Sequence, residues 1–86
     1  MKLKQGYVLR EIAGSWAVLP LRGVNLDGII KLNGSGALLW QAMEQGADYD
    51  ELVSKLTSEY DVSVEDAKND VRAFLNVLLQ YGCVEE

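Results

Sequence analysis

The residues of this chain that can support chemistry are few, and they form no catalytic pattern. The sequence contains no histidine, so the commonest general base and metal ligand is missing. The single cysteine, Cys83, has no base beside it to activate it as a nucleophile. The carboxylates Asp48, Asp50 and Glu51 are explained by the start of a helix, where the dipole favours negative charge. We therefore expect a protein that is not an enzyme and that uses no metal or cofactor.

Glycines also precede one expected helix, in the stretch Asn33-Gly34-Ser35-Gly36. This stretch lacks the lysine and the spacing of a nucleotide-binding loop. A tight connection from a strand into a helix, capped by the Asn33 side chain, explains it better.

Two cations and two leucines in the last expected helix form an edge that is both positive and apolar. On a helical wheel with about 100° per residue, one edge of the apolar stripe carries Lys68, Arg72, Leu75 and Leu79. Such an edge can hold side chains of a bound peptide. It can equally consist of core leucines whose cationic neighbours cover them at the surface.

An exposed strand beside this edge would favour peptide binding. The turn signal Asp27-Gly28 introduces a short β-branched run, made of Gly28, Ile29, Ile30, Lys31 and Leu32. If this strand is the outermost one, its unpaired N–H and C=O groups form a template for another chain. An extended peptide would then add as a fourth strand. A second copy of the chain can pair with the same edge, so the sequence leaves the oligomeric state open.

The first third of the chain predicts the sheet to which that strand belongs. Two further strands are expected at Tyr7–Ile12 and Ser15–Leu19, with a turn at Ala13-Gly14. Pro20 ends the second strand because proline has no N–H to donate. Three short strands of this kind form an antiparallel sheet, which needs helices over one face.

The remaining chain predicts three helices in a winged helix-turn-helix-like arrangement. The expected boundaries are Gly34 to Gln45, a capping box at Asp48 and Glu51 with an end at Tyr60, and Ser63 to Gly82. The predicted fold class is α+β, a three-stranded antiparallel sheet followed by a three-helix bundle. Residues 1–86 are expected to form one domain.

The charge pattern argues against the DNA binding that a winged helix suggests. The net charge is −5, whereas a DNA-binding domain normally has a basic face. The first turns of the third helix carry Glu65, Asp66 and Asp70. Neither a secretory signal nor an apolar run of about 20 residues is found. Together with the lone Cys83, these observations predict a cytoplasmic protein without membrane or nucleic-acid partners.

The ordered set of these motifs resembles the PqqD-like family, which takes its name from a protein of pyrroloquinoline quinone biosynthesis. The resemblance covers almost the whole chain, and it rests on Val18-Leu19-Pro20, residues 28–33 running into Leu39-Trp40, Leu52-Val53 and Leu56 before Tyr60, and Asp70-Val71, Phe74-Leu75 and Leu78 before Gly82. The fold of this family is the RiPP recognition element, a binder of leader peptides.

The resemblance implies a site and partners. Family members bind the leader of a ribosomally made precursor peptide between the third strand and the third helix, and deliver it to a modifying enzyme, often a radical S-adenosylmethionine protein. Carried onto this sequence, the strand wall is residues 28–32 and the helix wall is Lys68, Arg72, Leu75 and Leu79. Trp40 is expected in the core, and Asp70 is expected to make a local polar contact.

The resulting hypothesis is a non-catalytic peptide chaperone. Two alternatives remain open: an adaptor that docks on a modifying enzyme without contacting a peptide, and a winged-helix DNA-binding regulator.

Overall fold

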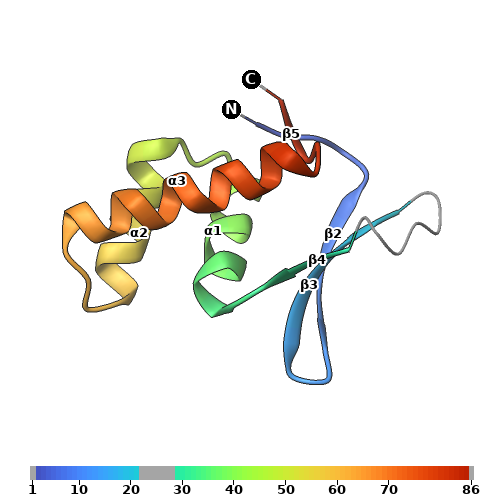
Figure 1. Cartoon of the computed structure of the whole chain (residues 1–86), viewed down its shortest axis with the longest axis horizontal. Coiled ribbons are helices and arrows are strands. Elements are labelled where there is room, and N and C mark those ends of the chain that lie inside the picture. Colours follow the sequence, from blue (N-terminus) through green and yellow to red (C-terminus); the bar gives the residue numbers. More distant parts are fainter. Residues whose placement is uncertain (1, 22–28, 86) are drawn as a thin grey trace.

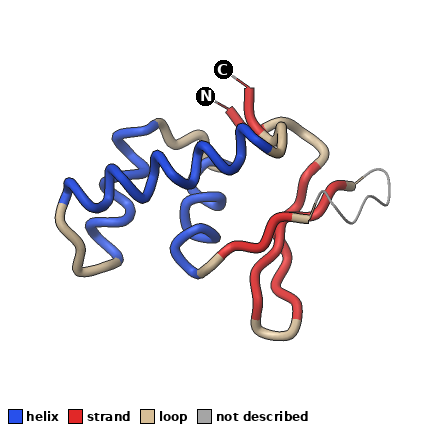
Figure 2. Tube along the Cα trace, in the orientation of Figure 1, coloured by secondary structure: helices blue, strands red, loops and turns tan. Residues whose placement is uncertain are grey.

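The computed structural model describes residues 2–21 and 29–85. Its elements, in chain order, are β1 (Lys2–Leu3), β2 (Tyr7–Ile12), β3 (Ser15–Pro20), β4 (Ile30–Leu32), α1 (Gly34–Glu44), α2 (Tyr49–Glu59), α3 (Val64–Gln80) and β5 (Val84–Glu85). Figure 1 shows α3 lying across α1 and α2, with the larger sheet at one end of this bundle. The tube view separates the strands from the helices in the same way (Figure 2). The predicted α+β fold class is confirmed.

The larger sheet is antiparallel and has the order β2-β3-β4. Its hairpin turns at Ala13 and Gly14, which both have positive φ, at 52° and 82°. Two left-handed residues give a tight turn whose twist matches that of the flanking strands. β3 ends at Pro20, one residue beyond the predicted strand Ser15–Leu19. Because β4 lies at the end of the strand order, the condition for strand addition, that the third strand is outermost, is met.

Polar caps fix the start of each helix where the sequence predicts it. The Asn33 side chain accepts a hydrogen bond from Gly36 N at 2.8 Å. Asp48 and Glu51 form the expected capping box. The Ser63 hydroxyl accepts from Asp66 N at 3.1 Å. Each cap satisfies a backbone N–H that the helix itself leaves without a partner.

β4 leads directly into α1, and the backbone at Gly36 lies close to the end of β4. A Cβ atom at this position would lie 3.2 Å from Asn33 Oδ1 and 3.3 Å from the Leu32 side chain. Contacts this short would push either the cap or the end of β4 away. Glycine therefore keeps the strand and the helix at a fixed angle, and this fixes the direction of the free strand edge.

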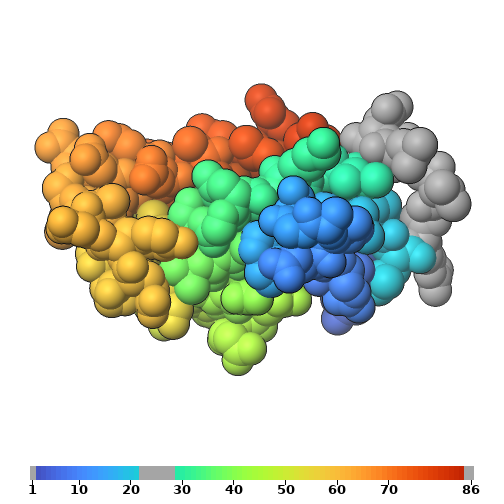
Figure 3. Space-filling model, turned by 90° about the horizontal axis from the view of Figure 1, so that it is seen from below, coloured from blue at the N-terminus to red at the C-terminus, as the bar shows by residue number. Residues whose placement is uncertain are grey.

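The core lies where the helices meet the inner face of the sheet. Trp40 is 1% exposed, which confirms its expected place in the core, and α3 contributes a continuous buried stripe. The buried cluster includes Val18, Ile30, Leu39, Trp40, Met43, Leu52, Val53, Leu56, Ala67, Val71, Phe74 and Leu78. Seen from below, the hairpin in blue covers one side of α1 in green, with α2 and α3 on the other side (Figure 3). No described helix is long and apolar enough to cross a membrane.

The two ends of the chain form a second, two-stranded sheet that the sequence analysis did not predict. β1 pairs antiparallel with β5, with Leu3 opposite Val84. Lys4 N also donates to Cys83 O at 2.8 Å, and both ends lie side by side in Figure 1. Strands of two residues have no detectable periodicity, and these two are separated by the whole domain. Only the packed fold brings them together.

Candidate functional site

The pairing between β2 and β3 determines which backbone groups of the sheet remain free. Leu21 N donates to Gly6 O at 2.7 Å, one position beyond the pair of Tyr7 with Pro20. Hydrogen-bonded and non-bonded pairs alternate along an antiparallel ladder, so Tyr7 and Pro20 form a non-bonded pair. This arrangement suits proline, which has no N–H to donate. Residues of β3 that lie an even number of positions from Leu21 share its orientation. Ala17 therefore directs its backbone groups toward β2.

The residues on either side of Ala17 therefore direct their backbone groups toward β4. Trp16 lies opposite Leu32, and Val18 lies opposite Ile30. Lys31, between them, directs its N–H and C=O away from β3. Within the described strands nothing pairs with this side of β4. The free edge of the sheet thus presents the backbone donor and acceptor of Lys31.

A groove runs between this free edge and α3. It has a volume of about 340 Å³. The strand side contributes Lys31 and Leu32, and the helix side contributes Asp70, Ala73, Phe74 and Val77. Phe74 is buried, whereas Val77 is 37% exposed. The groove therefore has backbone hydrogen-bonding groups on one side and apolar side chains on the other.

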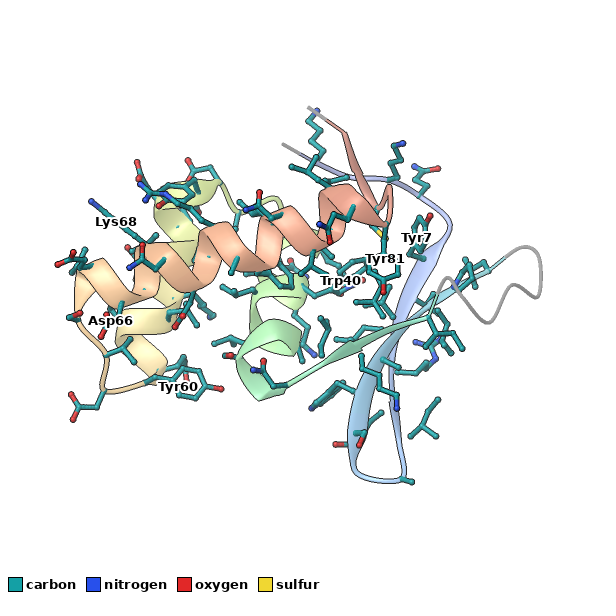
Figure 4. All side chains as sticks on the ribbon, viewed as in Figure 1. Tyr7, Trp40, Tyr60, Asp66, Lys68 and Tyr81 are labelled. Atoms are coloured by element: carbon teal, nitrogen blue, oxygen red, sulfur yellow. The ribbon has the colours of Figure 1, made fainter. Side chains whose placement is uncertain are left out.

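The groove continues beyond the end of β4 into a second hollow of about 360 Å³. Asp70 lines both hollows, together with Asn33 and Ser35. The far end is formed by Tyr60 with Leu56 and Val62. Tyr60 is 42% exposed, and Figure 4 shows it on the lower side of α3. The two hollows are therefore adjacent, and both border the junction of β4 with α1.

Two of the five residues of the predicted strand wall, Lys31 and Leu32, line this groove. Lys31 is exposed and Leu32 is half-buried, and both line it. Ile29 is half-buried just before β4, while Ile30 points into the core and is 3% exposed. Gly28 lies outside the described residues. Lys31 and Leu32 therefore line the groove, whereas the Ile30 side chain packs in the core.

The residues of the predicted helix wall do not line this groove. Lys68, Arg72, Leu75 and Leu79 lie on the other side of α3. Leu75 lines a different hollow, near β1, and the Tyr49 hydroxyl of α2 donates to Lys68 O at 3.5 Å. Figure 4 shows Lys68 on the upper side of α3, opposite Tyr60. The structure does not bring these four residues together with β4.

A helical wheel explains why the sequence favours one edge of α3 and the groove lies at the other. The buried stripe of α3 has its centre at Ala67, Val71, Phe74 and Leu78, and it has two edges. One edge carries the predicted residues, and the other carries Asp70, Ala73 and Val77. Both edges combine apolar and charged residues, so the wheel gives no reason to choose between them. Asp70, which the sequence analysis treated as structural, belongs to the groove.

Polar groups near the groove are of two kinds. The Asn33 carboxamide oxygen already accepts from Gly36 N and from the Ser35 hydroxyl, at 2.8 and 2.9 Å, so the cap uses it. Lys31 and Asp70 are both exposed at opposite sides of the groove. A guest chain would thus meet one positive and one negative side chain.

The single cysteine of the chain, Cys83, lies outside the groove and is buried. Burial raises the pKa of the Cys83 thiol, while a hydrogen bond with Tyr7 and the charge of Lys4 act in the opposite direction. A thiol with a raised pKa stays protonated near neutral pH and is a poor nucleophile. Among residues 2–21 and 29–85, no group of three or more His, Cys, Asp or Glu residues has the arrangement of a metal site.

Comparison with known proteins gives one family and two closely similar folds. The family model described as coenzyme PQQ synthesis protein D (PqqD) matches residues 16–84. The structure of TbiB1 in complex with the TbiA(beta) leader peptide is similar to this chain, with a TM-score of 0.82 and 26% identity. That similarity covers 99% of this chain and 95% of the other.

A second similar structure is lasso peptide synthetase B1 complexed with the leader peptide, with a TM-score of 0.80 and 25% identity. It covers 99% of this chain and 96% of the other. No match was found among curated proteins.

Proposed function

Since the chain belongs to the PqqD family, we propose that it binds the leader of a ribosomally made precursor peptide and presents that peptide to a modifying enzyme. The leader adds to the sheet as a strand beside β4, in the groove that α3 borders. The protein itself takes no part in the chemistry of the modification. Residues 1–86 act as one peptide-binding domain.

The observation that carries this proposal is the free edge of β4 beside an apolar helix face. Lys31 offers an N–H and a C=O that β3 does not use. Strand addition satisfies such groups in pairs, which makes the edge selective for an extended chain. The two similar structures, TbiB1 and lasso peptide synthetase B1, hold leader peptides. That likeness supports the same class of ligand here.

The free energies involved indicate that backbone hydrogen bonds alone would bind the leader weakly and that buried side chains must add to them. Each new ladder bond contributes roughly 0.5–1.5 kcal/mol, and β4 is short enough to make only a few. Ordering a flexible peptide costs on the order of 2–5 kcal/mol. Each buried apolar anchor contributes about 1.5–3 kcal/mol. Apolar leader residues that reach Ala73, Phe74 and Val77 would therefore decide affinity and sequence preference.

The charges beside the groove suggest how the leader is oriented. Lys31 favours an acidic leader residue near β4, and Asp70 favours a basic one farther along the groove. Lys68 and Arg72, which we expected to attract the leader, lie on the other flank of α3 and do not face the groove.

The proposed function includes a partner enzyme and a cellular compartment. The enzyme that receives the leader is proposed to be a radical S-adenosylmethionine protein, as the family resemblance suggests. A reducing cytoplasm is the proposed setting because the lone Cys83 has no second cysteine to pair with. The free strand edge can also bind a second copy of the chain, which a leader peptide would displace.

Amide chemical-shift mapping tests the proposal directly. The ligands are synthetic leader segments of small peptides encoded next to this gene. Binding should shift the amides of residues 29–32 together with those of Ala73 and Val77. Shifts confined to other surfaces, or no response to any leader while the modifying enzyme still binds, would favour an adaptor that contacts no peptide.

A further inference from the structure

Another hollow lies on the flank of α3 that faces away from the leader groove. It has a volume of about 740 Å³. Leu75 borders it from α3, and it extends between β1 and the loop that joins α1 to α2. Because the two hollows share no lining residue, a guest in one does not occupy the other.

The floor of this hollow is apolar. Trp40 and Met43 of α1 and Leu52 of α2 line it, and all three belong to the buried core. Leu3 and Leu75 are half-buried and pack against the same core. A large apolar side chain placed here would therefore extend the existing core and lose its contact with water.

The rim of the hollow has its positive charges on the β1 side. Lys2 and Lys4 are exposed at alternate positions of the chain, with Leu3 between them turned inward. The hydrogen bond from Lys4 N to Cys83 O fixes this backbone. On the same flank, the edge of α3 that bears Leu75 also carries Lys68 and Arg72. Four of the eight basic residues of an acidic chain thus lie on one side of α3.

Two carboxylates also line the hollow, on the side of the α1–α2 loop. The Asp48 carboxylate accepts from Glu51 N at 2.9 Å and caps α2, so it is already engaged. Glu44 is exposed at the end of α1. The hollow is therefore divided into a basic side along β1 and an acidic side along the loop.

A buried donor in the floor has no acceptor. Trp40 Nε1 is the single buried side-chain nitrogen or oxygen, among the described residues, that makes no hydrogen bond. Figure 4 shows Trp40 beneath α3, at the centre of the molecule. An indole N–H in this position gives a sensitive spectroscopic signal, because any change in packing above Trp40 alters its surroundings.

We propose that this hollow is a second docking site, for an acidic segment of a partner protein that inserts one large apolar side chain. The inference rests on the proposed function in one respect: the partner is the enzyme that receives the leader. Carboxylates of that segment face Lys2 and Lys4, and its apolar residue packs on Trp40 and Leu75. The two flanks of α3 then hold the peptide and its enzyme at the same time.

Peptide display gives a test that does not require the enzyme in hand. The probe is a phage-displayed library of random 12-residue peptides, selected against the immobilised full-length protein. We expect one class of binders rich in Asp and Glu around a single large apolar residue. Synthetic peptides of this class should lose at least tenfold in affinity when Lys2→Glu and Lys4→Glu are combined. They should shift the indole signal of Trp40.

Matched variants separate this site from the leader groove. Lys55→Glu reverses an exposed charge on α2 away from the hollow, and it should leave the affinity within about twofold. Val77→Asp in the leader groove should also leave it unchanged. Absence of acidic binders, an equal loss with Lys55→Glu, or a loss with Val77→Asp would overturn the inference. None of these results bears on leader binding, which the amide mapping tests separately.

Discussion

The two flanks of α3 have similar residues but different neighbours. One flank, with Asp70, Ala73 and Val77, faces the free edge of β4. The other, with Leu75 among its residues, faces β1 and the loop between α1 and α2. Both border a hollow, and both carry half-exposed apolar side chains. The difference is that only the first flank faces unpaired backbone groups.

That difference decides what each flank can recognise. Backbone groups bind any extended chain and leave selectivity to a few side-chain anchors. A hollow without a strand edge depends on side-chain shape and charge alone. Similar helix surfaces can therefore bind a peptide on one side and a folded partner on the other.

The largest effect is expected from a charge placed at the apolar anchor of the leader groove. Val77 and Leu79 are 37% and 39% exposed, so they form a matched pair on opposite sides of α3. Val77→Asp should weaken leader binding about 10- to 100-fold, since an apolar anchor contributes about 1.5–3 kcal/mol. Leu79→Asp should change it by less than about twofold. Calorimetric titration measures both, and equal losses would contradict the assignment of the flanks.

A smaller loss should follow from removing the free backbone donor. Lys31→Pro deletes the N–H that faces away from β3, and proline is tolerated at such a position of an edge strand. The sheet should survive, while leader affinity falls by up to about tenfold, as expected for a bond of roughly 0.5–1.5 kcal/mol. Ile30→Pro is the control for the register, because its N–H bonds to β3. Circular dichroism should show unfolding only in that control.

Association rates should distinguish the flanks by a few-fold. Lys31→Glu should slow binding of a leader whose paired segment is acidic, and it should reduce the dependence of the rate on salt. Lys68→Glu should leave the rate nearly unchanged, because Lys68 lies on the flank without the strand edge. Stopped-flow measurements at two salt concentrations compare them. A larger effect of Lys68 would restore the helix wall that the sequence suggested.

Alkaline pH should weaken the side of the molecule where the chain ends meet. Burial raises the pKa of Cys83 from its ordinary value of 9.0, and burial also raises that of Tyr7. Their contribution to stability is fully present below the ordinary values and is lost as the pH rises through the raised ones. The free energy of unfolding should therefore fall above about pH 9, and less steeply in Cys83→Ala. Denaturant titrations between pH 7 and 10.5 check this slope.

Local signals in the sequence predicted the elements well. The capping box of Asp48 and Glu51 and the cap at Ser63 start their helices at the expected positions. The turn at Ala13 and Gly14 forms the hairpin. These features depend on residues at most four apart, whose interaction does not require the rest of the fold. The strand wall of the groove follows for the same reason, since a short apolar run ends directly at the Asn33 cap.

Long-range features were missed. The pairing of β1 with β5 joins residues about eighty positions apart and has no sequence period to reveal it. The helix wall was assigned to Lys68, Arg72, Leu75 and Leu79 because their cations and leucines form a conspicuous edge. The less conspicuous edge with Ala73 and Val77 faces the strand. Asp70, one turn before Ala73, lies on this second edge and also lines the groove.

The sequence by itself determined the fold class, the caps and the presence of the third strand, because side-chain periodicity and capping act between near neighbours. Only the tertiary structure decided which edge of α3 faces that strand. Rotation of a helix about its axis is set by the packing of its whole buried stripe against α1, α2 and the sheet, and that packing joins residues from every part of the chain.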